Sequence, residues 1–292
     1  ENRPDGRMLE ISPIRPFYDA KSRSSHRDMI VRSIQVLKVI PKTKDIAVYD
    51  DFTSDATTKT INIPLLAGID KFLENCATVN YDGKIYVSGG SINNTSSNTF
   101  ICYDYPRNSF VRMADLITPR HSHSMYYWND NIFVVGGNTS AVEKYEIKTQ
   151  KWIKLANLNY EDVFKPILYV HNSFLYCFFG QRKENYVDFI YRLNLKNNKS
   201  KWEIVPYKNP EKIDLKLIGA GIIPGADSII FFGGKGKDGL RKENFSFNFL
   251  NNTFSRYQTD LEREAYFHES LMIELDKGLY GHFDTESSDH FL

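Results

Sequence analysis

Residues 124–137 read Ser-Met-Tyr-Tyr-Trp-Asn-Asp-Asn-Ile-Phe-Val-Val-Gly-Gly, and this stretch decides the fold. Two apolar runs flank a polar turn at residues 128–131, and Gly136 and Gly137 follow the second run. Turn residues between two short runs of aromatic and β-branched side chains predict a β-hairpin. Two glycines at its end let the backbone bend and let a neighbouring side chain approach closely.

The same unit recurs along the chain, each time with a polar turn between two apolar runs. Further copies occupy residues 77–90, 166–180 and 219–234, and the copy at 166–180 ends in a single glycine. The last glycines of the four copies, Gly90, Gly137, Gly180 and Gly234, lie 47, 43 and 54 residues apart. This period of 48 residues on average predicts a repeat protein, and a chain of 292 residues has room for six units.

A second hairpin follows each glycine position, and its two strands carry apolar or aromatic residues at a fixed spacing. The spacing is seven residues in four pairs: Tyr103 and Phe110, Tyr145 and Trp152, Leu195 and Trp202, and Phe247 and Phe254. With Pro119-Arg120 before the next unit, this pattern resembles the kelch motif, a repeat of about 50 residues. The resemblance covers residues 75–258 and is closest over 121–162.

The resemblance implies an all-β fold, a six-bladed kelch-type β-propeller that forms a single domain over residues 1–292. The blades are expected at 28–65, 75–116, 121–158, 163–206, 215–258, and 266–292 together with 7–12. The last unit is too short for four strands, and residues 8–11 form a strand-like piece with no hairpin of its own. We expect this N-terminal strand to complete the last blade and close the ring, which leaves no exposed sheet edge.

Charge and composition exclude several classes of protein. Lys and Arg number 37 against 36 Asp and Glu, so the formal net charge of +1 argues against a domain built to grip nucleic acid or an acidic membrane. No apolar run approaches the ~18 residues of a membrane helix, and the first residues do not resemble a signal peptide. Cys76, Cys102 and Cys177 match no zinc or redox spacing and lie in apolar runs, so we expect reduced core thiols and a cytoplasmic protein.

The sequence gives only weak evidence for a catalytic or metal site. His121 and His123 alternate beside Arg120 and could supply two metal ligands, but no third ligand follows at a fixed spacing. No Gly-x-Ser-x-Gly, P-loop or His-Glu-x-x-His motif is present. Residues 235–239 are glycine-rich and basic, but no helix-forming segment follows to make a phosphate site. We predict no catalytic residues, no metal and no cofactor, and we keep an enzyme with a small-molecule site in the central channel as an alternative.

The resemblance also implies where a partner binds. In the kelch family the loops after the glycines and the crossings between blades share one face, and rigid scaffolds carry binding loops. Several cations fall in these segments with Glu184, Asp238 and Glu243 among them, so ordinary solvated loops are the alternative. As a group the cations suit an acidic segment. The candidate partner-binding residues are Arg120, His121, Arg182, Lys183, Lys235, Lys237 and Arg241.

By analogy with the family, we expect a non-catalytic platform for protein–protein interaction. It would be the partner- or substrate-recognition domain of a larger protein, such as a cullin-type ubiquitin-ligase adaptor. The alternative within the binding class is a cytoskeletal scaffold associated with actin or microtubules. The expected partner is a protein or an acidic peptide segment, with no nucleic acid and no membrane, and flanking domains would mediate any oligomerisation.

Overall fold

The structure is a computed structural model, and it describes residues 36–40, 42–49, 57–60, 71–81, 84–104, 107–197 and 199–257. All of them belong to the compact unit Ser33–Leu292. The secondary structure of these residues consists of β-strands joined by turns and loops, with no helix among them. The all-β prediction is therefore confirmed.

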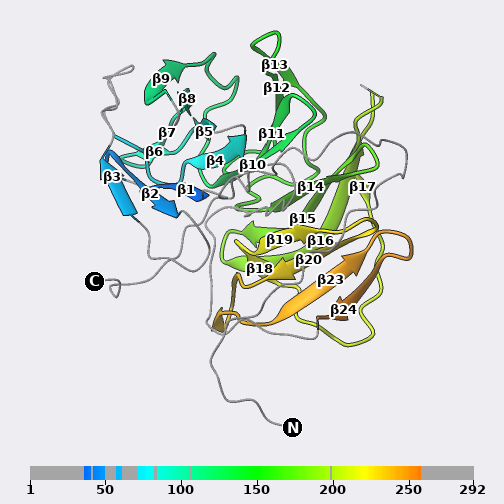
Figure 1. The fold of residues 1–292 in the computed structure, drawn as a ribbon. Helices are drawn as coiled ribbons and strands as arrows, with labels where there is room; N and C mark the ends of the chain where they lie inside the picture. The colour runs from blue at the N-terminus through cyan, green and yellow to red at the C-terminus, as the bar shows by residue number, and fades with distance from the viewer. Residues whose placement is uncertain are drawn as a thin grey trace, which may run out of the picture. The chain divides into compact units, whose positions relative to one another are not determined.

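The strands form successive antiparallel sheets, which we call blades 1 to 5 in chain order (Figure 1). Blade 1 has three described strands: β1 (Val36–Val39), β2 (Asp45–Tyr49) and β3 (Thr57–Thr60). Blade 2 contains β4 (Ala77–Tyr81), β5 (Lys84–Ser88), β8 (Phe100–Asp104) and β9 (Ser109–Arg112), with the hairpin β6 (Ser91–Ile92) and β7 (Thr95–Ser96) inserted. Blade 3 contains β10 (His123–Trp128), β11 (Asn131–Gly136), β12 (Val142–Glu146) and β13 (Lys151–Lys154).

Blades 4 and 5 continue the pattern. Blade 4 contains β14 (Ile167–His171), β15 (Phe174–Arg182), β16 (Asn185–Asn194) and β17 (Glu203–Ile204). Blade 5 contains β19 (Gly221–Pro224), β20 (Ser228–Phe232), β23 (Asn244–Asn248) and β24 (Thr253–Arg256). Three further strands form a separate small sheet: β18 (Leu217–Ile218), β21 (Lys235–Gly236) and β22 (Gly239–Leu240). In the chain, β18 comes before β19, and β21 and β22 come between β20 and β23. Blades 2 to 5 thus each have four strands, as a propeller requires.

The first strands of neighbouring blades lie side by side, because β10 contacts both β4 and β14. Backbone hydrogen bonds join equivalent residues just before these strands: Ser122 N donates to Asn75 O at 2.8 Å, and Lys165 N donates to Ser122 O at 2.9 Å. All three residues adopt a positive φ, between 48° and 53°. The repeat in the sequence therefore produces a repeated link between blades.

Aromatic side chains fill the space between blades, as the sequence predicted. The Trp152 ring of blade 3 lies 5.1 Å from the Phe100 ring of blade 2, and its Nε1 donates to Ala114 O at 2.6 Å. Trp202 of blade 4 repeats this contact, because its Nε1 donates to Ala156 O at 2.8 Å. A large apolar ring with one polar group fits such a place, where most neighbours are apolar and one carbonyl needs a donor.

The glycine pair is required by both conformation and space. Gly137 has a φ of 89°, and a Cβ there would collide with the carbonyl oxygen of His121. Blade 4 has only Gly180, and Phe179 takes the preceding position with a φ of 55°. This strained residue is fully buried, and its ring packs 5.4 Å from that of Phe231. Ring burial in the core offsets the backbone strain, which is about 1–3 kcal/mol for such a residue.

Two predictions fall outside the described residues. The closing strand at residues 7–12 and the last unit at 266–292 both lie there, so the count of six blades and the closure of the ring stay predictions. Among the residues that the structure does describe, no helix is long and apolar enough to cross a bilayer.

Candidate partner-binding face

The turns after the glycines and the crossings between blades meet at one end of the blades. Isolated bridges pair Glu74 with Ser91, Ser97 with Arg120, Gly137 with Val163, and Phe164 with Gln181. In blade 5 the same relationship pairs Ile218 with Lys235 across β18 and β21. We call this end the loop face, and it comprises the post-glycine segments 91–99, 138–141, 181–186 and 235–241 with the crossings 114–122, 156–165 and 209–218.

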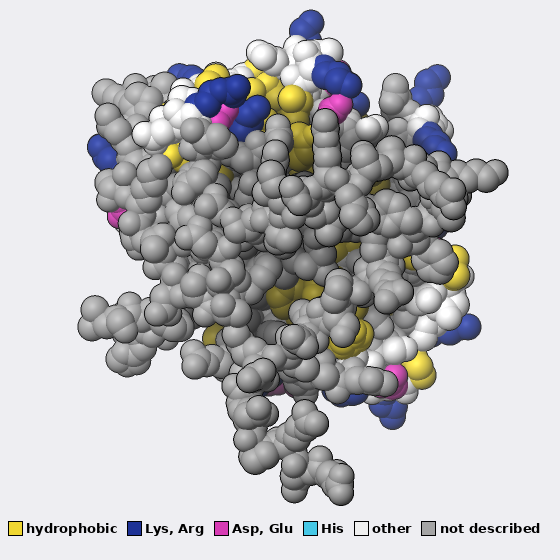
Figure 2. Space-filling view, viewed as in Figure 1, with side chains coloured by type: hydrophobic (Ala, Val, Ile, Leu, Met, Phe, Trp, Pro, Cys, Tyr) yellow, Lys and Arg dark blue, Asp and Glu magenta, His cyan; other side chains and the backbone are white. Residues whose placement is uncertain are grey.

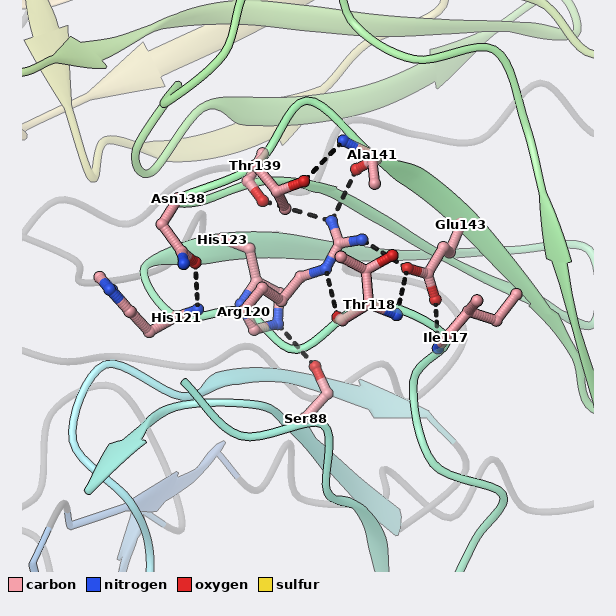
Figure 3. Close-up of polar contacts among 11 residues, drawn as sticks. Ser88, Ile117, Thr118, Arg120, His121, His123, Asn138, Thr139, Ala141 and Glu143 are labelled. Atoms are coloured by element: carbon pink, nitrogen blue, oxygen red, sulfur yellow. Dashed lines mark hydrogen bonds and ion pairs between the residues drawn. The ribbon is translucent and has the colours of Figure 1, made fainter. Parts of the chain in front are cut away.

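Arg120 lies inside the protein rather than on the loop face. Its side chain has no exposed surface, and Nη2 lies 2.5 Å from Oε1 of Glu143, which is equally buried (Figure 3). Its Nη1 donates to Ala141 O at 2.7 Å. The prediction that Arg120 contacts a partner is therefore wrong, because a fully buried side chain offers no surface.

The buried ion pair holds the crossing into blade 3. Glu143 of β12 also accepts the backbone N–H groups of Ile117 and Thr118, at 2.8 and 3.0 Å (Figure 3). Burial lowers the pKa of Arg120, and the carboxylate of Glu143 opposes this change. A buried carboxylate needs such a set of donors to remain charged. The pair therefore fixes the crossing 114–122 of the loop face against strand β12 of blade 3.

His121 and His123 have separate surroundings. The His121 ring is half-buried on the loop face, 6.1 Å from the Phe164 ring and nearly parallel to it, and burial lowers its pKa. His123 is fully buried, and its Nε2 lies 2.7 Å from Oγ of Ser88 in blade 2 (Figure 3). The same Ser88 hydroxyl lies 3.0 Å from Sδ of Met125, which can accept a hydrogen bond from it. No group of three His, Cys, Asp or Glu side chains suited to a metal occurs in the described part of the chain.

Arg241 links two segments of the loop face to each other. Its guanidinium pairs with the Asp214 carboxylate and donates from Nη1 to Asp214 O at 2.5 Å, and only 14% of its side chain is exposed. A further hydrogen bond runs from Nη2 to Lys216 O. Arg241 thereby ties the crossing before β18 to the β21–β22 hairpin, and it has little surface left for a partner.

The remaining candidate cations lie at the tips of two hairpins. Arg182 and Lys183 occupy the β15–β16 tip, where Lys183 is exposed, and Lys237 is exposed at the β21–β22 tip. His121 lies near the first tip, because its ring stacks on Phe164, whose backbone pairs with Gln181. Lys235 begins the second hairpin and is half-buried. On the face that Figure 2 shows, the coloured Lys and Arg side chains lie in separate places around the rim, with Asp and Glu side chains beside some of them.

An aromatic cluster beside Arg182 was missed by sequence reasoning. The Arg182 guanidinium carbon lies 4.5 Å from the centre of the Tyr160 ring, and Tyr160 is 39% exposed. The Tyr160 ring lies 5.9 Å from that of Tyr191 and 6.2 Å from that of Phe189. The available signal was the position of Tyr160, an aromatic residue in a crossing rather than in a predicted strand.

The three cysteines are thiols that form no disulfide with one another, as expected. Cys102 and Cys177 are buried in β8 and β15, and burial raises the pKa of Cys102 to about 11. A thiol with a raised pKa is a poor nucleophile near neutral pH. These two cysteines therefore act as small core side chains.

Comparison with known proteins agrees with the propeller fold. The model of the Attractin/LZTR1 beta-propeller family matches residues 85–280 of the 292. Among solved structures, the chain is similar to the protein of "Structure of YjhT", with a TM-score of 0.61 and 14% identity, over 82% of this chain and 87% of that one. A likeness at this identity supports the fold.

Curated relatives share shorter stretches. A putative F-box/kelch-repeat protein of Arabidopsis thaliana is 32% identical over 84 residues, which are 27% of this chain and 23% of the relative. Kelch repeat protein C2 of vaccinia virus is 34% identical over 80 residues, 25% of this chain and 16% of the relative. Kelch repeat and BTB domain-containing protein 8 of Xenopus tropicalis is 25% identical over 154 residues, 48% of this chain and 24% of the relative. The match thus spans less than a quarter of each relative.

Proposed function

Because the chain belongs to the kelch-repeat β-propellers of the Attractin/LZTR1 family, we propose that it is a non-catalytic protein-interaction domain whose loop face binds the partner. The observation that carries this proposal is the construction of that face. Backbone bridges, the buried Arg120–Glu143 pair and the Arg241–Asp214 pair at the surface hold its segments in place, while Lys183 and Lys237 are exposed at hairpin tips. A rigid base with exposed polar tips is the usual form of a recognition surface.

We propose further that this domain recognises a partner or substrate for a larger protein, such as a cullin-type ubiquitin-ligase adaptor. Support comes from the names of two relatives, in which kelch repeats occur with an F-box or with a BTB domain. The domain itself would supply recognition only.

The proposed partner is a protein or peptide segment that carries acidic side chains. The residues proposed to contact it are His121, Arg182, Lys183, Lys235 and Lys237. Arg241 would act indirectly, because it is paired with Asp214 and positions the hairpin that carries Lys235 and Lys237. Exposed charges of this kind chiefly set the rate of association and its dependence on salt.

The test is affinity capture from cell extract at low and at high salt, followed by identification of the bound proteins. The chain is compared with the double variant Lys183→Glu/Lys237→Glu and with the control Lys196→Glu/Lys199→Glu. The control pair is exposed in the β16–β17 turn, at the opposite end of blade 4. We expect a salt-sensitive set of proteins that the control retains and the first variant loses, with unchanged melting temperatures. Capture of nothing, or equal capture by both variants, would contradict the proposal.

We also propose that the propeller has six blades and that residues 7–12 close the ring. Five blades occupy the described residues, and the family model extends to residue 280, beyond the last strand of blade 5. One more unit therefore has sequence available at the C-terminal side, and its missing strand would come from the N-terminus.

A further inference from the structure

Arg182 is a positioned cation, and the described residues place no carboxylate on it. Its guanidinium lies over the Tyr160 ring, and its Nε is buried with no hydrogen-bond partner among the described residues. The other arginines of the described segments mostly pair with carboxylates: Arg107 with Asp104, Arg112 with Asp115, Arg120 with Glu143, Arg192 with Glu203, and Arg241 with Asp214. The guanidinium of Arg256 also has no carboxylate partner among the described residues, but Arg256 ends the outer strand β24.

The same blade contains a complete version of this arrangement. Arg192 lies 4.7 Å from the centre of the Phe174 ring, and its Nε and Nη2 both donate to Glu203 Oε2 at 3.2 Å. The site thus combines an aromatic ring, a guanidinium and a carboxylate. Arg182 and Tyr160 reproduce the first two parts at 4.5 Å, and the carboxylate is the part that the described residues do not supply.

We propose that Arg182 and Tyr160 form the anchor of the loop face and bind one carboxylate side chain of a partner protein. This inference rests on the proposed function and names the chemistry of its site. Arginine presents a planar fork that matches a carboxylate, and stacking on a ring fixes the plane of that fork before binding. Less side-chain entropy is then lost when the partner arrives.

Tyr160 is held firmly enough to serve as a platform. Its ring lies 5.9 Å from that of Tyr191 and 6.2 Å from that of Phe189, so it packs against both. Tyr160 is nevertheless 39% exposed, and Phe189 is half-buried beside it. An aliphatic or aromatic side chain next to the partner's carboxylate can therefore cover this apolar surface.

Neighbouring acids limit the kind of partner. Glu161 follows Tyr160 and Glu184 lies two residues after Arg182, and both are exposed. These two negative charges repel a partner segment with several consecutive acidic residues, but they permit a single carboxylate to bind the guanidinium of Arg182. Asp188 lies near Tyr207, because burial and then the charge of this carboxylate raise the pKa of Tyr207. The partner that fits is a segment with one Asp or Glu flanked by an apolar residue, not a polyacidic tail.

A selection with random 12-residue peptides displayed on phage tests this anchor directly. We expect the peptides that bind the chain to share one acid beside an aliphatic or aromatic residue. Arg182→Gln should weaken a selected peptide by about ten- to hundredfold, as for a lost charged hydrogen bond. Tyr160→Leu should also weaken it, whereas the control Arg256→Gln should leave affinity unchanged.

The decisive measurement is a double-mutant cycle between Arg182→Gln and the peptide's acid-to-amide change. If the two groups touch, the double change should cost no more than either single change. Additive losses, or selected peptides without an acid, would overturn the anchor. Peptides that depend on Lys183 and Lys237 but not on Arg182 would also overturn it and leave the proposed function standing. If no peptide binds, retention of the captured proteins by Arg182→Gln overturns the anchor, and capture of none overturns both proposals.

Discussion

Arg120 Nη2 lies 2.5 Å from Glu143 Oε1, and neither side chain has any exposed surface. The pair joins the crossing into blade 3 to the third strand of that blade, and it satisfies two further backbone N–H groups. Such a pair contributes to specificity of structure more than to net stability, but loss of one member leaves a bare charge in the interior.

Arg120→Met should therefore lower the free energy of unfolding by about 3–5 kcal/mol. The matched control is Arg112→Met, which removes an ion pair with Asp115 whose side chains are 41% and 31% exposed. That change should cost less than about 1 kcal/mol. Urea denaturation measures both values, and similar small losses for the two variants would contradict the importance of the buried pair.

Gly137→Ala tests the glycine pair. The residue has a φ of 89° and its Cβ would meet the His121 carbonyl, so strain and collision act together. Gly239 is the control, because its φ is 120° but nothing lies within 4 Å of a Cβ there. We expect a loss of about 1–3 kcal/mol from strain at Gly239 and a larger loss at Gly137. Equal melting temperatures for the two variants would show that the close approach has no effect.

The hairpins were predictable from the sequence because the same short-range pattern recurs. Turn residues, glycine pairs and a seven-residue aromatic spacing are all local, and the register confirms that Tyr145 pairs with Trp152 and Tyr103 with Phe110. The left-handed conformation of Phe179 was not predictable. It depends on core packing against Phe231 and Phe254, which are far away in the chain.

The candidate site was harder to predict, because the sequence does not say which cations turn inward. Arg120 follows a proline in a polar segment, as a loop cation would, and its partner Glu143 lies 23 residues later on another strand. Arg241 looks equally free until the fold brings Asp214 beside it. The aromatic partner of Arg182, Tyr160, likewise comes from the preceding crossing. Each of these pairs depends on tertiary contacts between segments 22 or more residues apart.

Trp152 tests the contact between blades 2 and 3. Trp152→Ala removes a half-buried ring and its hydrogen bond to Ala114, so it should cost about 3 kcal/mol. Trp152→Phe keeps most of the packing and loses the hydrogen bond, which should cost about 1 kcal/mol. Trp202→Phe should behave alike, because Trp202 makes the equivalent bond to Ala156. Guanidinium chloride unfolding measures these changes, and an unchanged stability of Trp152→Ala would argue that this ring does not join the blades.

Ring closure is tested at the N-terminus. Deletion of residues 1–12 should lower the melting temperature by several degrees, because it opens a sheet edge and exposes apolar area. Replacement of Met8, Leu9 and Ile11 by serine should have nearly the same effect, whereas deletion of residues 1–6 alone should have little. The measurement is differential scanning calorimetry, and a melting temperature that stays constant in the first two variants would rule out closure by this strand.

The stability of the protein should depend on pH through His123. Burial lowers the pKa of His123 well below its usual value, and the nearby Arg120 and His121 lower it further. The unfolded chain binds a proton at this residue as the pH falls below about 6.5, while the folded chain does not. The free energy of unfolding should therefore decrease with falling pH, by up to about 1.4 kcal/mol per pH unit from this group.

In His123→Gln, which keeps a polar group toward Ser88, the decrease between about pH 7 and 5 should be shallower by that amount. His171→Gln is the comparison: burial lowers the pKa of the half-buried His171 and the nearby Asp227 opposes this change, so the slope should change less than in His123→Gln. Urea unfolding at a series of pH values gives the slopes, and an equal slope for wild type and His123→Gln would mean that His123 does not titrate as a buried neutral group.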